Sequence, residues 1–334
     1  MDADTKVAVI GSGSWGTAFG NALATKGLKV TLWARRPELA DAIQGGHENP
    51  DYLPGVFLSP RLRAAHELEV AVEDAGVIVM AVPSQGFRDV TRQVAALADP
   101  SAPFVSLAKG LEIDSLKRMS EVVGEEAPGA RVACLSGPNL AQEIAKGYPA
   151  ASVVASNDPD TADGLQELFM SPIFRTYSSN DIRGVEISGV VKNVIAIATG
   201  IAEGLGFGDN TKATVITRGL AEMTRLGVKM GADSATFSGL AGVGDLICTC
   251  MSSLSRNHHV GLELGKGVKV ADILKQMRQV AEGVRSSKAV QQLAEQHAID
   301  LPICSGVFRV IHEGQEVTAM LSDLLRTVRV READ

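Results

Sequence analysis

The sequence is poor in cysteine and in net positive charge, and each shortage argues against a class of protein. Its four cysteines, at positions 134, 248, 250 and 304, form neither a C-x-x-C pair nor a His/Cys ligand set. We therefore expect no disulfide and no bound metal. The formal net charge is −7 and the pI is about 5.5. Because nucleic acids and anionic membranes are bound by clustered positive charge, this balance argues against both partners.

The sequence also lacks a recognisable export signal and a clean membrane-spanning run. Residues 1–4 are acidic and lead directly into an apolar run, with no basic segment before it, so we expect a cytoplasmic protein. The longest apolar stretch, residues 185–205, is long enough to span a bilayer, but it contains two glutamates, a lysine and an asparagine. This polar content predicts a helix buried inside a folded domain and no integral membrane segment.

A glycine-rich turn lies near the start of the chain. The segment Gly11-Ser12-Gly13-Ser14-Trp15-Gly16 follows an apolar run at 7–10, and an amphipathic stretch at 15–26 leads to a second apolar run at 28–33. In such a βαβ unit the first glycine makes the tight turn, the second lets the backbone approach a pyrophosphate, and the third lets the helix pack closely on its strand. N–H groups at the amino end of the helix then bind phosphate. The pattern predicts dinucleotide binding at Gly11, Gly13 and Gly16.

Two arginines stand where many dinucleotide-binding units carry an acidic residue. Arg35 and Arg36 follow the second apolar run, and the next acid, Glu38, already belongs to the following predicted helix. A carboxylate at this place bonds the ribose 2′-hydroxyl, whereas a guanidinium accommodates a 2′-phosphate. The pair favours NADP as the cofactor without excluding NAD. The alternative is that both arginines are only solvated surface charges.

The order of apolar runs predicts two domains. Short β-branched runs at 77–82, 104–108, 131–135 and 151–155 alternate with helical segments, as in a doubly wound sheet. After residue 181 the alternation stops and the pattern becomes helical. We therefore predict an α/β Rossmann-type N-terminal domain over residues 1–181 and an all-α C-terminal domain over 182–334, with the substrate bound between them. The long apolar helix of the second domain raises the possibility of a homodimer, although core packing explains the same residues.

Lys192 is the strongest candidate for acid–base chemistry. It lies mid-helix among valines and isoleucines, next to Asn193, and a glycine-rich segment at 239–244 could bring Asp245 to it. Burial favours the neutral amine and a neighbouring carboxylate favours the charged form, so the balance stays open. A lysine in this setting can exchange a proton with an alcohol or ketone oxygen as hydride moves. The alternative is a snorkelling or ion-paired lysine.

A second polar group suggests phosphate binding. Ser255, Arg256 and Asn257 stand at the start of a predicted helix that runs toward Gly265, and they combine paired guanidinium donors with neutral ones. The alternative is a serine helix cap followed by two exposed residues. Lys109 follows a predicted strand and could contact a phosphate or the reacting oxygen, although lysines are common at strand ends.

Taken together, these residues identify a resemblance. Over nearly its whole length the chain resembles the bacterial NAD(P)-dependent sn-glycerol-3-phosphate dehydrogenases. The resemblance rests on ordered blocks: GSGSWGTA at 11–18, AVPSQ at 81–85, SLAKGLE at 106–112, SGPNLAQE at 136–143, VKNVIAIATGIAEGLGFGDNTKA at 191–213, GLAGVGDL at 239–246 and SRN at 255–257.

The resemblance implies reversible reduction of dihydroxyacetone phosphate to sn-glycerol 3-phosphate, which supplies phospholipid synthesis, with Lys192 as the proton acceptor. It implies that the cofactor is lined by Ser14, Trp15, Arg35, Arg36, Lys109, Ala141, Arg256, Val280 and Glu282. It implies that the substrate is held by Lys109, Gly137, Asn139, Lys192, Asp245, Ser255, Arg256 and Asn257. Asn139 is a departure, because a hydroxyl residue is common at this place in the family.

Two other functions compete with this interpretation. A β-hydroxyacid dehydrogenase shares the predicted domain pair and the lysine, but it binds a carboxylate in place of a phosphate. A dinucleotide-binding redox sensor would hold the cofactor without turnover. The acidic pI and the absence of a basic recognition helix weigh against a DNA-binding sensor.

Overall fold

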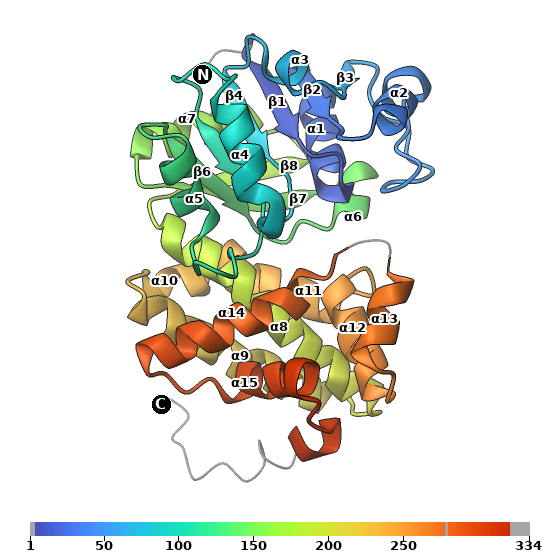
Figure 1. Ribbon diagram of the computed structural model, residues 1–334, viewed down its shortest axis with the longest axis vertical. Helices are drawn as coiled ribbons and strands as arrows, with labels where there is room; N and C mark the ends of the chain where they lie inside the picture. The colour runs from blue at the N-terminus through green and yellow to red at the C-terminus, as the bar shows by residue number, and fades with distance from the viewer. Residues whose placement is uncertain (1–3, 278–279, 321–334) are drawn as a thin grey trace.

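The computed structural model describes residues 4–277 and 280–320, and it forms two units stacked along the long axis of the molecule (Figure 1). The first unit contains one eight-stranded sheet with the order β3-β2-β1-β4-β5-β6-β7-β8. Its strands are β1 (Lys6–Ile10), β2 (Lys29–Trp33), β3 (Leu62–Ala65), β4 (Val77–Met80), β5 (Phe104–Ser106), β6 (Val132–Ser136), β7 (Ala150–Ser156) and β8 (Phe174–Ser179). The first six are mutually parallel and have the strand order of a Rossmann fold.

Helices cover both faces of this sheet. They are α1 (Ser14–Lys26), α2 (Pro37–Gly46), α3 (Leu68–Val72), α4 (Phe87–Ala95), α5 (Met119–Glu126), α6 (Ala141–Ala145) and α7 (Pro159–Phe169), with a short 3₁₀ turn at Ser84–Gly86. One apolar cluster joins the sheet to α1, α2 and α7, and a second joins its other face to α3, α4 and α5. Because both faces are covered, central strands such as β4 are buried at every position and read as continuous apolar runs.

The second unit is built around one long helix. Its helices are α8 (Ile182–Gly204), α9 (Asp209–Lys229), α10 (Ser234–Phe237), α11 (Asp245–Met251), α12 (Arg256–Gly265), α13 (Val270–Gln276), α14 (Glu282–His297) and α15 (Pro302–Phe308), with π-helical turns at Leu240–Gly244 and Arg309–Glu313. Helices α9, α11, α12, α14 and α15 pack around α8. The described part of this unit contains no strand, which confirms the α/β plus all-α fold class.

Helix α8 is the predicted buried helix. By length and composition alone, α8 and the segment Ser234–Met251 could each cross a membrane, but the apolar stretch of the first is wholly buried in the protein and that of the second is 39% buried. The core helix of a soluble protein passes the same test. The chain's own helices cover most of α8. The homodimer stays a prediction.

Glycines set the distance between α8 and α12. Gly200 and Gly204 of α8 face Gly261 and Gly265 of α12, and each lies against the backbone of the opposite helix. A Cβ at Gly261 would lie 2.0 Å from the carbonyl oxygen of Ile197. The two helices are thus in backbone contact, and their register is fixed by packing that no larger residue permits.

The sheet departs from expectation at its edges. The strands expected at 77–82 and 104–108 end earlier, at Met80 and Ser106, where the chain leaves the ladder. Strands β3 and β8 were not predicted from the sequence. Strand β3 has only four residues, and β8 alternates buried with exposed positions and includes polar residues. Strand β7 pairs antiparallel with β6, so the last two strands run against the first six. All four cysteines are free.

Candidate active site

The glycine turn between β1 and α1 has the geometry that a dinucleotide needs. Gly11 has φ of 119°, and a Cβ there would lie 2.6 Å from the carbonyl oxygen of Ala81. A Cβ at Gly16 would lie 2.1 Å from the carbonyl oxygen of Gly11, so this glycine allows the close contact of helix and turn. The Cβ direction of Gly13 is open to 4 Å. Only the middle glycine therefore leaves room for a ligand, as its predicted role requires.

The amino end of α1 is prepared for an anion. Its N-cap is Gly13, which carries no side chain to bond the first-turn N–H groups, and the first turn holds no acidic residue. The indole Nε1 of Trp15 is buried with no hydrogen-bond partner among the described residues. Backbone N–H groups at a helix amino end favour phosphate. This end of the sheet therefore fits a dinucleotide pyrophosphate.

Lys192, Asp245 and Lys109 form one buried cluster. The Lys192 Nζ lies 2.8 Å from Oδ1 of Asp245 and donates to the Thr249 hydroxyl at 2.5 Å. The Lys109 Nζ lies 2.6 Å from Oδ2 of the same carboxylate. The side chains of Lys192 and Asp245 are 5% and 2% exposed. One carboxylate thus bridges two ammonium groups, one from each unit of the molecule.

The charges in this cluster shift its pKa values. Burial acts against the charged carboxylate of Asp245, but Lys109 and Lys192 outweigh it and its pKa is lowered. Burial lowers the pKa of Lys109 to about 8, against the opposing attraction of Asp245. Asp245 is therefore an anion at neutral pH, whereas Lys109 loses its charge as the pH rises through about 8.

Backbone contacts hold Lys109 in this position. Its Nζ donates to the carbonyl oxygen of Gly137 at 2.9 Å, and its own carbonyl oxygen accepts from Nδ2 of Asn193 at 3.1 Å. Gly137 has φ of 152°, in the region that favours glycine. Close by, Oδ1 of Asn139 accepts from the Ser152 hydroxyl at 2.6 Å, while its buried Nδ2 has no partner among the described residues. Asn139 therefore has a donor free for a ligand.

The Ser255–Asn257 group combines a helix cap with site residues. Ser255 is the N-cap of α12 and accepts from the backbone N–H of His258 at 3.2 Å, as the structural alternative predicted. Asn257 donates from Nδ2 to Oδ1 of Asn193 at 2.8 Å, which ties α12 to α8 beside Lys192. Arg256 is exposed, although desolvation of its guanidinium by the surrounding protein lowers its pKa and the charge of Glu282 acts against this shift.

Three other predicted cofactor residues come from separate elements. Glu282, the first residue of α14, accepts from the N–H and the hydroxyl of Ser84 at 3.4 and 3.0 Å, which connects the helical unit to the turn after β4. Ala141 begins α6, which packs on α1. Val280 is half-buried just before α14. After β2, Arg35 is exposed and Arg36 forms an ion pair with Asp51.

Comparison with known proteins identifies the family. Models of NAD-dependent glycerol-3-phosphate dehydrogenase match the chain at residues 6–162 for the N-terminal part and 181–322 for the C-terminal part. The chain belongs to this dehydrogenase family. It is 50% identical to the glycerol-3-phosphate dehydrogenase [NAD(P)+] of Thermobifida fusca over 329 residues, 97% of this chain and 98% of that protein. It is 46% identical to the enzyme of the same name from Moorella thermoacetica, over 98% of each chain.

Solved structures agree with this membership. The crystal structure of glycerol-3-phosphate dehydrogenase from Coxiella burnetii has a TM-score of 0.94 and 38% identity, covering 98% of this chain and 100% of that one. A ketopantoate reductase from Ralstonia eutropha has a TM-score of 0.61 at 15% identity, covering 95% of this chain and 100% of that one. This second likeness concerns the fold alone.

Two buried polar contacts, one of them at the candidate site, were not predicted from sequence. Thr249 lies four residues after Asp245 on α11, so that both side chains face Lys192; this spacing is a signal that sequence reading could have used. Glu186 of α8 is 7% exposed and accepts from the N–H and hydroxyl of Ser120 at 2.8 and 2.6 Å and from Arg118 at 2.9 Å. It fixes the amino end of α5 to α8. No local sequence pattern predicts this long-range contact.

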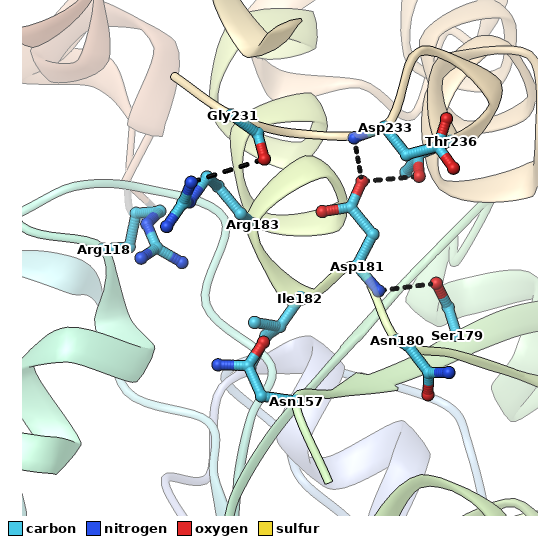
Figure 2. A pocket seen from close by; sticks show the side chains of 10 residues that line it. All are labelled: Arg118, Asn157, Ser179, Asn180, Asp181, Ile182, Arg183, Gly231, Asp233 and Thr236. Carbon is cyan, nitrogen blue, oxygen red and sulfur yellow. Dashed lines mark hydrogen bonds between the residues drawn. The ribbon is translucent and has the colours of Figure 1, made fainter. Parts of the chain in front are cut away.

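A pocket of about 480 Å³ lies elsewhere, where β8 passes into α8 (Figure 2). It contains none of the predicted site residues, and its charged groups already have partners, which for Arg118 are the carboxylates of Glu121 and Glu186. Arg183 donates to the carbonyl oxygens of Met230 and Gly231, while Asp181 accepts from the N–H of Asp233 and the hydroxyl of Thr236. These bonds give Arg183 and Asp181 a structural role. The described residues include no cluster of three or more His, Cys, Asp or Glu placed to hold a metal.

Proposed function

We propose that this dehydrogenase reversibly reduces dihydroxyacetone phosphate to sn-glycerol 3-phosphate with NAD(P)H, in the cytoplasm, and so supplies phospholipid synthesis. The observation that carries the proposal is the buried cluster in which Asp245 joins Lys192 to Lys109. It stands where the helical unit meets the carboxyl ends of β5 and β6, the edge at which open α/β sheets bind ligands.

We assign the two units different tasks. Residues 1–181 hold the cofactor through Gly11, Gly13 and Gly16 and the flanking residues Ser14, Trp15, Arg35 and Arg36. Residues 182–334 supply the catalytic lysine and most substrate contacts, while Ala141, Val280, Glu282 and Arg256 close around the cofactor from both sides. The arginines after β2 favour NADP, and NAD is also used.

Lys192 is the proton donor in the direction of reduction. A bound NAD(P)H would supply the hydride that C2 of the substrate gains on reduction. Lys192 would give a proton from Nζ to the C2 oxygen, which completes the secondary alcohol and leaves the amine neutral. Asp245 and Thr249 hold Nζ on one side and so direct its remaining hydrogen toward the substrate. In the reverse direction the same amine accepts the proton.

The remaining polar groups position the substrate. Arg256 supplies paired donors to the phosphate, and Ser255, Asn257 and the free amide of Asn139 supply neutral contacts. Lys109, beside Gly137, places a charge next to the reacting end. Binding energy from the remote phosphate then helps to orient the ketone for reaction.

The direct test is the oxidation of NADPH and of NADH, measured separately with dihydroxyacetone phosphate. Lys192→Ala should nearly abolish turnover while cofactor binding, measured by fluorescence, is largely kept. Lys229→Ala, at an exposed site at the end of α9, is the matched control and should behave as wild type. A Lys192→Ala enzyme with wild-type rates would remove this lysine from the mechanism. Family membership does not favour the hydroxyacid or sensor alternatives, and preferential turnover of a small hydroxyacid or complete lack of turnover would revive them.

A further inference from the structure

We propose that Asp51 sets the balance between NADP and NAD by sharing Arg36 with the cofactor. The inference rests on the proposed use of a dinucleotide. It concerns Asp51, an acid that lies 15 residues after Arg36 in the sequence. In the sequence, Arg35 and Arg36 follow β2, and the next acid, Glu38, belongs to α2. In the fold, Asp51 arrives from a separate segment and forms an ion pair with Arg36.

The segment that carries Asp51 is fixed to the glycine turn. Asn49 is fully buried, and its Nδ2 donates to the carbonyl oxygen of Ser12 at 2.9 Å and to the Thr17 hydroxyl at 2.8 Å. The Ser14 hydroxyl donates to the carbonyl oxygen of Tyr52 at 2.8 Å. These bonds lie on both sides of Asp51 in the sequence, so its backbone is held against the proposed cofactor site.

Arg36 stands at the place where dinucleotide-binding folds read the ribose. It is the N-cap of α2, shortly after the carboxyl end of β2, and this strand end lies beside the glycine turn. The side chains of Arg36 and Asp51 are 51% and 42% exposed, so a ligand can reach both. Arg35 is exposed too, and no ion pair with a described residue occupies it.

Arg36 and Asp51 together offer a group for each cofactor: a guanidinium for the 2′-phosphate of NADP and a carboxylate for the 2′-hydroxyl of NAD. A 2′-phosphate carries about −1.5 to −2 charges, so it attracts Arg36 and is repelled by Asp51. Its binding also requires the ion pair between Arg36 and Asp51 to break. A free 2′-hydroxyl can donate to the Asp51 carboxylate, as it does to the acid in NAD-binding units. Asp51 therefore weakens NADP binding and supports NAD binding, which allows one site to accept either.

The test is titration calorimetry of NADP+ and NAD+ with the whole protein and no substrate. Asp51→Asn should tighten NADP+ binding about two- to five-fold, the range that an exposed ion pair is worth, and should weaken NAD+ binding. The ratio of the two dissociation constants therefore shifts toward NADP+. Asp41→Asn, which removes an equal charge from an exposed position of α2, should leave the ratio unchanged.

Two further variants keep the inference decidable. Asp51→Glu retains the charge and should keep the ratio within about two-fold of wild type, while Arg36→Ala should weaken NADP+ and spare NAD+. The proposal is overturned if Asp51→Asn, with an unchanged melting temperature, leaves the ratio as in wild type or shifts it toward NAD+. An equal shift in Asp41→Asn would also overturn it, because the effect would then be general electrostatics. Because no substrate is present, failure of the proposed reaction would leave these affinities readable.

Discussion

Substituting Gly261 tests whether backbone contact between α8 and α12 builds the site. An alanine Cβ there would lie 2.0 Å from the carbonyl oxygen of Ile197 and 2.9 Å from the backbone nitrogen of Ile201. Both neighbours are backbone atoms of a buried helix, so no side chain can rotate away. Ordinary contact begins at 3.4 Å, and the helices must therefore separate by about 1.4 Å at this point.

Two opposing effects decide whether Gly261→Ala raises or lowers the free energy of unfolding. Replacing glycine by alanine inside a helix stabilises it by about 1 kcal/mol. Overpacking a close-packed core costs about 1–3 kcal/mol, and a clash with backbone belongs at the upper end of that range. We expect a net loss of about 1–2 kcal/mol. Because Asn257 of α12 bonds Asn193 beside Lys192, the same displacement should lower kcat/KM, by up to about 100-fold if the shift at the site approaches 1 Å.

The assay pairs thermal melting with steady-state turnover of dihydroxyacetone phosphate. Gly124→Ala is the matched control, since this glycine of α5 has nothing within 4 Å of its Cβ direction. The control should melt slightly higher and keep wild-type turnover, whereas Gly261→Ala should melt lower and turn over more slowly. If Gly261→Ala instead matched the control in both measurements, the close helix contact would have no part in positioning the site.

Two further predictions concern buried charges. Glu186→Ala leaves Arg118 without its buried partner and should lower the free energy of unfolding by about 3–5 kcal/mol, with a smaller loss for Glu186→Gln. Unchanged denaturation curves would contradict the stabilising role of this contact between α5 and α8. Because the pKa of Lys109 is lowered to about 8, its ammonium is present below that pH and is lost above it, so kcat/KM should fall as pH rises through about 8. Lys109→Arg keeps the charge and should flatten this decline, and a wild-type profile that is level from pH 7 to 9 would refute the assignment.

Local patterns were sufficient for most of the fold. The glycine turn, the apolar runs and the change to helical periodicity near residue 181 all depend on neighbouring residues, and the structure places elements there within a few residues. The failures are at the sheet edge, where burial is one-sided or the strand is short. Only Leu62 and Ala65 of β3 are buried, and its pairing with β2 depends on tertiary contacts that four residues cannot signal.

The candidate site was predictable where its residues follow a strand or begin a helix. Lys109 follows β5, and Ser255 caps α12, so each has a local signal. Asp51 has none, because its relation to Arg36 depends on Asn49 folding back over the glycine turn. Sequence order alone therefore predicted an arginine site and overlooked its acidic partner.

The polar residues of α8 explain why a helix with the composition of a membrane span belongs inside this enzyme. Glu186 binds the start of α5, Lys192 binds Asp245, and Asn193 bonds both the carbonyl oxygen of Lys109 and Asn257. Burying a polar group costs stability unless it is paired, and each of the partners named here comes from another element. Three of the four polar residues that argue against membrane insertion therefore have structural or catalytic partners: Glu186 and Asn193 join the two units, and Lys192 belongs to the proposed catalytic cluster.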